Sequence, residues 1–267
     1  MTTERFQWLT GVAARQYGLV TGGQATRVGV ERGELEQFSM RALLFELDHD
    51  VYQLTSSPLA PRFAYPYATW LALEPATYGF ERDDQAVLSH GSAARLHGIG
   101  AVSAPATTFT VGAQPSVVPR AVELHHRVPT DVTRVGPLLV TTPHRTIVDL
   151  VVSGADHIEV RGALSDAVRR DLVDLLAVYD ELRPLADQYE FPADGPEFAG
   201  YFLPDVDAGE LSARNLRGLA CIVVAGRVAD TELILGPALA AVPGGDRVSA
   251  ALVRSLAAEI VGRTERV

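Results

Sequence analysis

The spacing of apolar and polar residues predicts three helices and a tight turn at the start of the chain. Residues 5–17 place their apolar side chains at the three- and four-residue spacing of one helical face. A short second helix is expected over residues 21–28, because a threonine or glycine at its start can cap it. Gly29 tolerates the positive φ of a sharp turn, and a third helix is expected over residues 31–38.

A hairpin of two strands is predicted directly after these helices. Residues 43–47 and 51–54 are rich in strand-forming side chains, and the two aspartates within residues 48–50 suit a turn. A helix-turn-helix followed by such a hairpin is the outline of a winged helix-turn-helix, a module often used to bind DNA. We therefore assign residues 1–57 to this module, with a proline-containing linker behind it.

Residues 62–267 mix helical and strand patterns. One helix is expected after Pro66 and another within residues 88–99, where small side chains allow close packing and Gly98 suits the helix end. A threonine and a proline at 142–143 begin a further helix. The predicted strands are residues 107–111, 121–126 and 138–141.

From about residue 156 the apolar spacing is helical. Residues 190–206 contain several Pro and Gly and are expected to be irregular. Asp207 is expected to cap a helix through Leu216, and a final helix is expected over residues 246–262. The predicted fold class is α+β: an N-terminal winged helix-turn-helix, then a larger mixed α/β domain with a helical C-terminal part.

Composition limits the chemistry and the location. The chain has 23 Arg and no Lys, which excludes a P-loop lysine and Schiff-base catalysis. Its single cysteine, Cys221, excludes an internal disulfide and suits a reducing compartment. No signal peptide and no apolar run of membrane-spanning length is seen, so we expect a cytoplasmic protein without a membrane partner. The net charge of −10 means that any DNA contact must come from a local patch.

The middle of the chain holds the residues that could carry out chemistry, which are His90, His97, His125, His126, His144 and Asp149. No His-x-x-x-His spacing and no cysteine accompanies them, so structural histidines are predicted rather than a metal site. Ser89 and Ser92 flank His90 without the Gly-x-Ser-x-Gly elbow of hydrolases, and helix capping explains them. Arg145 and Asp149 have the spacing of a helical ion pair. We expect no catalytic residue, metal or cofactor, and hence no enzyme.

Three blocks of sequence occur in a characteristic order. They are the predicted winged helix-turn-helix ending in Val51-Tyr52, the stretch from Leu88-Ser89-His90 to His97-Gly98, and Thr141-Thr142-Pro143-His144-Arg145-Thr146-Ile147-Val148-Asp149-Leu150. Together they resemble the AbiEi family in its actinobacterial form, the antitoxins of type IV toxin–antitoxin and abortive-infection systems. The resemblance covers about residues 5–180.

This resemblance implies a transcription regulator for phage defence. Its N-terminal domain would bind double-stranded operator DNA and repress its own operon. Its C-terminal domain would counter a nucleotidyltransferase-like toxin encoded beside it. Arginine can bind guanine and glutamine can bind adenine in the major groove. The residues expected to contact DNA are Gln24, Arg27, Arg32, Gln37, Arg41 and His49.

The predicted DNA face is unusually acidic. Where AbiEi relatives usually have basic residues, this chain has Glu31, Glu34, Glu36, Glu46, Asp48 and Asp50. Carboxylates at the start of a recognition helix repel phosphate. An alternative from another functional class therefore stays open: a protein-interaction module whose winged helix no longer binds DNA.

Overall fold

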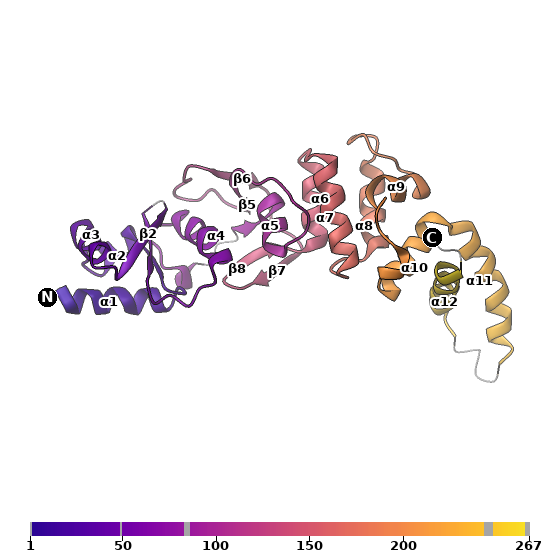
Figure 1. Cartoon of the computed structure of the whole chain (residues 1–267), viewed down its shortest axis with the longest axis horizontal. Helices are drawn as coiled ribbons and strands as arrows, with labels where there is room; N and C mark the ends of the chain where they lie inside the picture. Colours follow the sequence, from indigo (N-terminus) through magenta and orange to yellow (C-terminus); the bar gives the residue numbers. More distant parts are fainter. Residues whose placement is uncertain (1, 49, 83–85, 243–247, 265–267) are drawn as a thin grey trace. The chain divides into compact units, whose positions relative to one another are not determined.

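The computed structural model describes residues 2–48, 50–82, 86–242 and 248–264 as a mixed α/β protein with two sheets and a helical C-terminal part (Figure 1). Its chain divides into two compact units. The first unit comprises the residues up to Leu96 together with Ala104–Thr142. The second comprises His97–Ser103 together with the residues from Pro143 onward. Within the described residues, no helix is long and apolar enough to cross a membrane.

The first unit begins with three helices and a three-stranded antiparallel sheet in the order β1-β3-β2. In chain order the elements are α1 (Thr2–Ala14), β1 (Leu19–Thr21), α2 (Gly22–Arg27), α3 (Arg32–Met40), β2 (Leu44–Asp48) and β3 (Val51–Leu54). The helices and the hairpin lie close to where the sequence pattern predicts them, although α1 begins and ends three residues earlier than expected. β1 was not predicted, because three residues are too few to show the two-residue period of a strand.

Capping fixes α2 and the turn that follows it. The Thr21 hydroxyl accepts the N–H of Gln24 at 3.0 Å, and the Gln24 side-chain oxygen accepts the N–H of Thr21 at 3.1 Å. These reciprocal bonds form a capping box. Gly29 follows with a φ of +74°, which other residues adopt only with strain. The sharp turn predicted at this glycine is confirmed.

Five further strands form a second sheet in the order β6-β5-β4-β8-β7, in which the pairs β5–β6 and β4–β8 are parallel. The elements are α4 (Pro61–Ala72), η1 (Gly79–Glu81), β4 (Val87–Leu88), α5 (His90–His97), β5 (Thr107–Val111), β6 (Val122–His126), β7 (Val132–Val135) and β8 (Leu138–Thr141). The prediction that the first helix starts after Pro66 was wrong. It begins at Pro61, because the fixed φ of proline suits the first helical turn.

One buried cluster joins the two sheets of the first unit. Leu19 of β1 and Val51 of β3 are fully buried in the same cluster as Leu71 of α4, Leu88 of β4 and Phe109 of β5. The elements that precede α4 therefore share a core with the five-stranded sheet.

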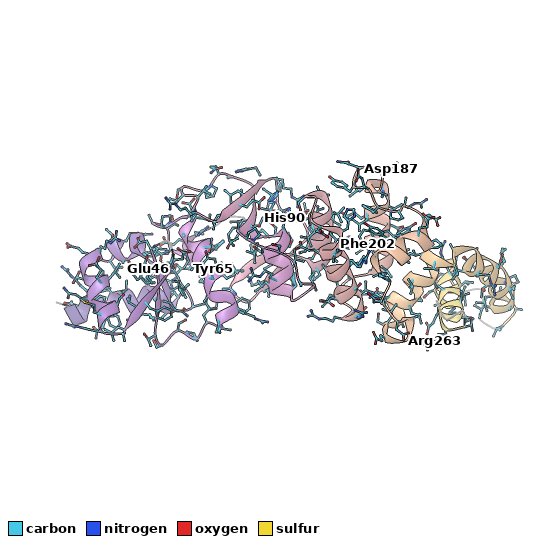
Figure 2. The ribbon with its side chains drawn as sticks, turned by 45° about the horizontal axis from the view of Figure 1, so that its top comes forward. Glu46, Tyr65, His90, Asp187, Phe202 and Arg263 are labelled. Carbon is cyan, nitrogen blue, oxygen red and sulfur yellow. The ribbon has the colours of Figure 1, made fainter. Side chains whose placement is uncertain are left out.

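The second unit is helical, as the sequence predicts from about residue 156. Its elements are α6 (Pro143–Val152), α7 (His157–Arg169), α8 (Leu175–Leu182), η2 (Arg183–Leu185), α9 (Gly195–Phe202), η3 (Ala208–Glu210), α10 (Ala213–Val223), α11 (Ala225–Ala240) and α12 (Ala250–Thr264). Two predictions were wrong here. Residues 190–206, expected to be irregular, contain α9, whose Phe198 and Phe202 are fully buried (Figure 2 labels Phe202). Asp207 caps only the short η3, whereas Ser212 caps α10.

Candidate functional site

Helix α3 buries one side and exposes the other. Leu35 and Phe38 are each 1% exposed and anchor the helix in a cluster with side chains of α1 and β2. Arg32, Gln37 and Arg41 are exposed at the start of the helix, in its second half and directly after its end. Three of the six residues predicted to contact DNA therefore lie on the surface of this part of the chain.

The two arginines of this surface differ in their partners. The Arg32 side chain lies 3.7 Å from the carboxylate of Glu36, and both side chains are more than half exposed. Arg41 has no carboxylate at ion-pair distance among the described residues. An exposed pair such as Arg32–Glu36 is worth little and can be broken by a competing anion.

Glu34 turns back toward the start of α3. Its carboxylate accepts the backbone N–H of Glu31 at 3.1 Å and pairs with the Arg5 guanidinium at 2.7 Å. The backbone hydrogen bond, and then the bond from Arg5, lower the pKa of Glu34. The Glu34 carboxylate is therefore already bound to the backbone of Glu31 and to Arg5.

Gln24 is fully buried and lies inside the first unit. Its oxygen accepts a hydrogen bond from the Gln16 side chain at 2.8 Å, and its nitrogen donates to the Thr77 carbonyl at 2.7 Å. It therefore offers no surface to a DNA base, and the expectation that it contacts DNA is corrected. The sequence signal for its actual role is the three-residue spacing from Thr21 to Gln24, which is that of a capping box.

Arg27 is held by the segment that follows α4. Its guanidinium donates to the Ala76 carbonyl at 3.0 Å and to the Glu81 carboxylate at 3.1 Å, and lies 3.8 Å from the centre of the Tyr78 ring. The Arg27 guanidinium, which was predicted to contact DNA, is therefore engaged by residues of its own unit. His49, also predicted to contact DNA, lies outside the described residues.

Asp50 stands at the tip of the β2–β3 hairpin with a φ of +60°. Its carbonyl accepts the N–H of Gly22, the first residue of α2, at 2.8 Å, and its carboxylate accepts the Tyr52 hydroxyl at 3.1 Å. A Cβ placed on Gly22 would lie 2.0 Å from this carboxylate, so the two residues pack tightly. Burial, and then the charge of Asp50, raise the pKa of Tyr52 to about 12.

An apolar patch borders the exposed side of α3, and sequence reasoning missed it. Met40 is 80% exposed, Phe45 46% and Leu43 37%. The signal available in the sequence was the strand alternation, which buries Leu44 and turns Phe45 outward. We call Met40, Leu43 and Phe45 the α3–β2 apolar patch.

The histidines of the middle region do not meet in one place. The rings of His90 and His125 stack with their centres 3.8 Å apart. His90 Nδ1 lies 2.9 Å from the hydroxyl of Ser89, which accepts a hydrogen bond from Thr110 at 3.0 Å. Within the described part of the chain, no three His, Cys, Asp or Glu side chains are arranged to hold a metal ion.

A separate polar network lies at the start of α6. Asp149 is fully buried and accepts the Arg145 side chain at 2.7 Å, which confirms the predicted ion pair. Glu181 of α8 accepts from Arg145 at 3.4 Å and lies 2.8 Å from His144 Nε2. These contacts tie α6 to α8, which is a structural role.

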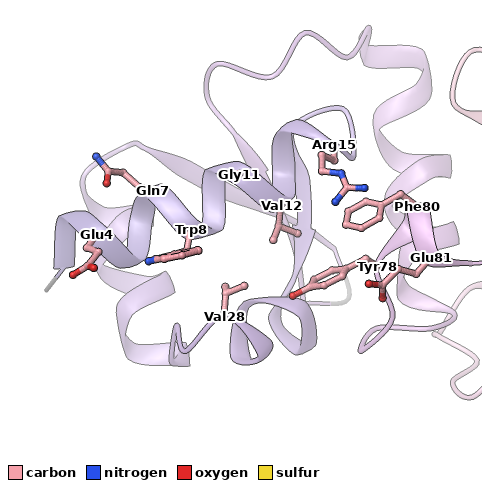
Figure 3. Close-up of a pocket in the computed structure, with 10 residues that line it drawn as sticks. All are labelled: Glu4, Gln7, Trp8, Gly11, Val12, Arg15, Val28, Tyr78, Phe80 and Glu81. Atoms are coloured by element: carbon pink, nitrogen blue, oxygen red, sulfur yellow. The ribbon is translucent and has the colours of Figure 1, made fainter.

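A cavity of about 540 Å³ lies beside α1 (Figure 3). Its lining includes Trp8 and Val12 of α1 together with Tyr78 and Phe80, and the Arg15 guanidinium lies 3.5 Å from the centre of the Phe80 ring. Among the described residues that line it there is no Ser, Cys or His.

Comparison with known proteins gives no assignment, because neither a model of a known protein family nor a curated protein matches this chain.

Proposed function

We propose that the protein is an antitoxin-type transcriptional repressor that binds its own operator DNA. The observation that carries the proposal is the order and capping of α2, the Gly29 turn, α3 and the β2–β3 hairpin, packed with β1 in the order β1-β3-β2. A winged helix-turn-helix uses this order, and its second helix enters the major groove.

The proposed DNA face consists of Arg32, Gln37 and Arg41. Arg41 is the strongest phosphate or guanine ligand of the three, because it has no carboxylate partner among the described residues. Gln24 and Arg27 do not belong to this face, since the first is buried and the guanidinium of the second donates to the Ala76 carbonyl and lies on the Tyr78 ring.

The affinity is expected to depend only weakly on salt. If Arg32 and Arg41 each neutralise one phosphate, the logarithm of the binding constant per protomer should fall with the logarithm of salt with a slope of about −2. Glu36 opposes binding, so Glu36→Gln should tighten binding to any sequence.

The test is fluorescence anisotropy with the DNA upstream of the protein's own coding sequence, at several salt concentrations. Arg41→Gln should reduce the salt slope by about 1 when Arg41 contacts a phosphate, and should weaken binding by about 1–3 kcal/mol when it reads a guanine. Arg120→Gln removes the same charge from an exposed position outside the proposed face and should leave binding unchanged. The repressor proposal fails if the wild-type protein and Glu36→Gln both show no binding at low salt.

The antitoxin part of the proposal rests on the three sequence blocks that resemble the AbiEi family. It expects a nucleotidyltransferase-like toxin encoded beside this chain. Growth arrest by that neighbouring protein should be relieved when the two are expressed together. Arg41→Gln should retain this relief, because the proposed DNA face and the counteraction of the toxin are separate activities.

A second candidate is a protein-interaction module, which the α3–β2 apolar patch favours. Exposed Met and Phe side chains are common at protein interfaces. In this case Met40→Gln with Phe45→Ser should abolish the partner's binding in a pull-down with the neighbouring toxin, whereas Arg41→Gln should not.

A further inference from the structure

The cavity beside α1 is bordered by a row of side chains from that helix. Glu4, Trp8 and Val12 are spaced four residues apart, so they follow one another along one side of α1, and all three line the cavity (Figure 3). Val28 and Tyr78 line it from outside α1. Trp8 is 62% exposed, although tryptophan is a largely buried residue type. Its ring is therefore accessible to a ligand in the cavity.

The chain's own arginines show which group the aromatic rings of this lining hold. The Arg27 guanidinium lies 3.8 Å from the centre of the Tyr78 ring and donates to the Glu81 carboxylate at 3.1 Å. The Arg15 guanidinium lies 3.5 Å from the centre of the Phe80 ring. A guanidinium stacks on an aromatic ring because the ring face is electronegative and the cation is planar and weakly hydrated.

Trp8 and Glu4 offer the same combination, an aromatic ring with a carboxylate one helical turn away. Among the described residues, no arginine lies over the Trp8 ring and none pairs with Glu4. The indole ring is the aromatic group that attracts cations most strongly. A guanidinium from outside the chain can stack on this ring and donate to the carboxylate in the forked geometry that suits both groups.

The charges near Glu4 favour a cation at this end of the cavity. Arg5, the neighbour of Glu4 in sequence, is bound to Glu34 at 2.7 Å. Arg15 directly follows the last residue of α1, which is ten residues beyond Glu4. At a rise of about 1.5 Å per residue this is about 15 Å, more than the screening length of about 8 Å in physiological salt. Neither arginine therefore neutralises Glu4.

We propose that the cavity beside α1 binds a guanidinium ligand of the arginine type. Its guanidinium lies on the Trp8 ring and pairs with the Glu4 carboxylate, and its methylene stem packs on Val12 and Val28. An ammonium group fits less well, because it is a compact, strongly hydrated charge without a planar face. The proposal does not depend on DNA binding, since none of these residues belongs to the proposed DNA face.

A ¹H–¹⁵N NMR titration of the full chain tests this proposal. N-acetyl-L-argininamide should shift the indole N–H peak of Trp8 saturably. The peak of Trp70 should move little, because that ring is already stacked on Tyr67 and lies against the Arg82 guanidinium. N-acetyl-L-citrullinamide, in which an uncharged urea replaces the guanidinium at nearly the same shape, should cause no saturable shift. N-acetyl-L-lysinamide should bind more weakly than the arginine compound.

Two substitutions test the residues that hold the cation. Glu4→Gln and Trp8→Leu should each raise the dissociation constant by about 2–5-fold, the change expected for one exposed ion pair or one exposed cation–π contact. Glu197→Gln is the matched control, because Glu197 is also an exposed glutamate in the first turn of a helix, and it should leave binding unchanged. In Trp8→Leu, the backbone amide peaks of Gly11 and Val28 report binding, since both residues line the cavity.

Circular dichroism checks that each variant is folded, and Glu4→Gln alone decides if Trp8→Leu loses helical signal. Titration with free L-arginine identifies the source of the ligand. Tighter binding of free arginine would indicate a small molecule, and tighter binding of the capped amide would indicate an arginine residue of another protein. The proposal is overturned if neither compound shifts the Trp8 peak saturably, if the citrulline compound binds equally well, or if binding is unchanged in the folded variants.

Discussion

Two glycines on either side of the start of α3 have opposite effects on stability. Gly29 has a φ of +74° and Gly33 lies within the helix, and a Cβ added to either would meet no atom within 4 Å. Backbone conformation alone therefore decides the effect of adding a methyl group. The turn at Gly29 could be predicted from the sequence, because glycine is the residue that adopts a positive φ without steric cost.

Gly29→Ala should lower the free energy of unfolding by about 1–2 kcal/mol, the cost of the left-handed conformation for an L-residue. Gly33→Ala should raise it by up to about 1 kcal/mol, because alanine loses less backbone entropy in a helix. Urea denaturation measures both. Equal effects of the two substitutions would contradict the assigned turn.

Tyr52 makes the protein sensitive to alkali. Its pKa is about 12 in the folded state, against 10.0 for an ordinary tyrosine, so the folded state holds this proton more tightly. The resulting stabilisation is complete below pH 10 and is lost between pH 10 and pH 12. Each pH unit in this window removes up to about 1.4 kcal/mol of stability.

Tyr52→Phe should flatten this decline, since phenylalanine has no proton to lose. Urea denaturation at pH 8, 10 and 11 gives the comparison. The variant should lose about 1 kcal/mol at pH 8 through the missing hydrogen bond to Asp50 and should fall less steeply above pH 10. A decline as steep as that of the wild-type protein would show that Tyr52 is not its source.

At the scale of elements, Asn215 connects three helices of the second unit. It is fully buried on α10. Its oxygen accepts the N–H of Leu175 at the start of α8 at 2.9 Å, and its nitrogen donates to the carbonyl of Val168 near the end of α7 at 3.1 Å. Asn215→Ala should reduce the free energy of unfolding by about 2–3 kcal/mol, because both backbone groups lose their partner in the interior.

The control is Asn215→Asp, which keeps the acceptor for Leu175 and, when its carboxyl group is neutral, has one O–H donor in place of the two N–H donors of the amide. It should be intermediate in stability at low pH, where the carboxyl group is neutral. Thermal denaturation followed by circular dichroism checks the order of the three proteins. An alanine variant as stable as the wild-type would exclude the connecting role.

Asn215 also explains why the start of α10 was misassigned from the sequence. Asp207 and Ser212 are both good capping residues, so local preference cannot choose between them. Ser212 accepts the N–H of Asn215 at 3.2 Å, and the buried contacts of Asn215 with α7 and α8 fix the helix start there. Those contacts join residues about 40 apart in sequence, which a local pattern does not record.

At the scale of the whole molecule, the shared core of the first unit determines how it unfolds. Leu19, fully buried on β1, lies in one cluster with Phe109 of β5. Leu19→Ala should lower stability by about 2–5 kcal/mol and accelerate hydrogen exchange of the β5 amides. Leu43→Ala, at a position 37% exposed, removes the same atoms and should change β5 exchange little. Unchanged β5 protection in Leu19→Ala would mean that the two sheets open separately.

The helices and strands of this unit could be predicted from the sequence more fully than the way in which they pack together. Strands β5, β6 and β8 were predicted because each is a run of four or five residues rich in strand-forming side chains. The two-residue β4 was missed, although it is the strand that joins β5 to β8. The residues predicted to contact DNA were chosen by the chemical type of their side chains. Gln24 is buried and Arg27 is engaged because both contact residues 76–81, and the spacing of residues in the sequence does not reveal contacts between segments this far apart.

Both tryptophans of the chain, Trp8 on α1 and Trp70 on α4, belong to the first unit. Trp8 is 62% exposed, whereas Trp70 stacks on Tyr67 with ring centres 5.5 Å apart and lies 3.8 Å from the Arg82 guanidinium. Intrinsic tryptophan fluorescence therefore reports on this unit alone, while the far-ultraviolet circular dichroism signal comes from the helices of both units. One denaturation experiment recorded with both signals can therefore show, without any added label, whether the first unit unfolds together with the rest of the chain.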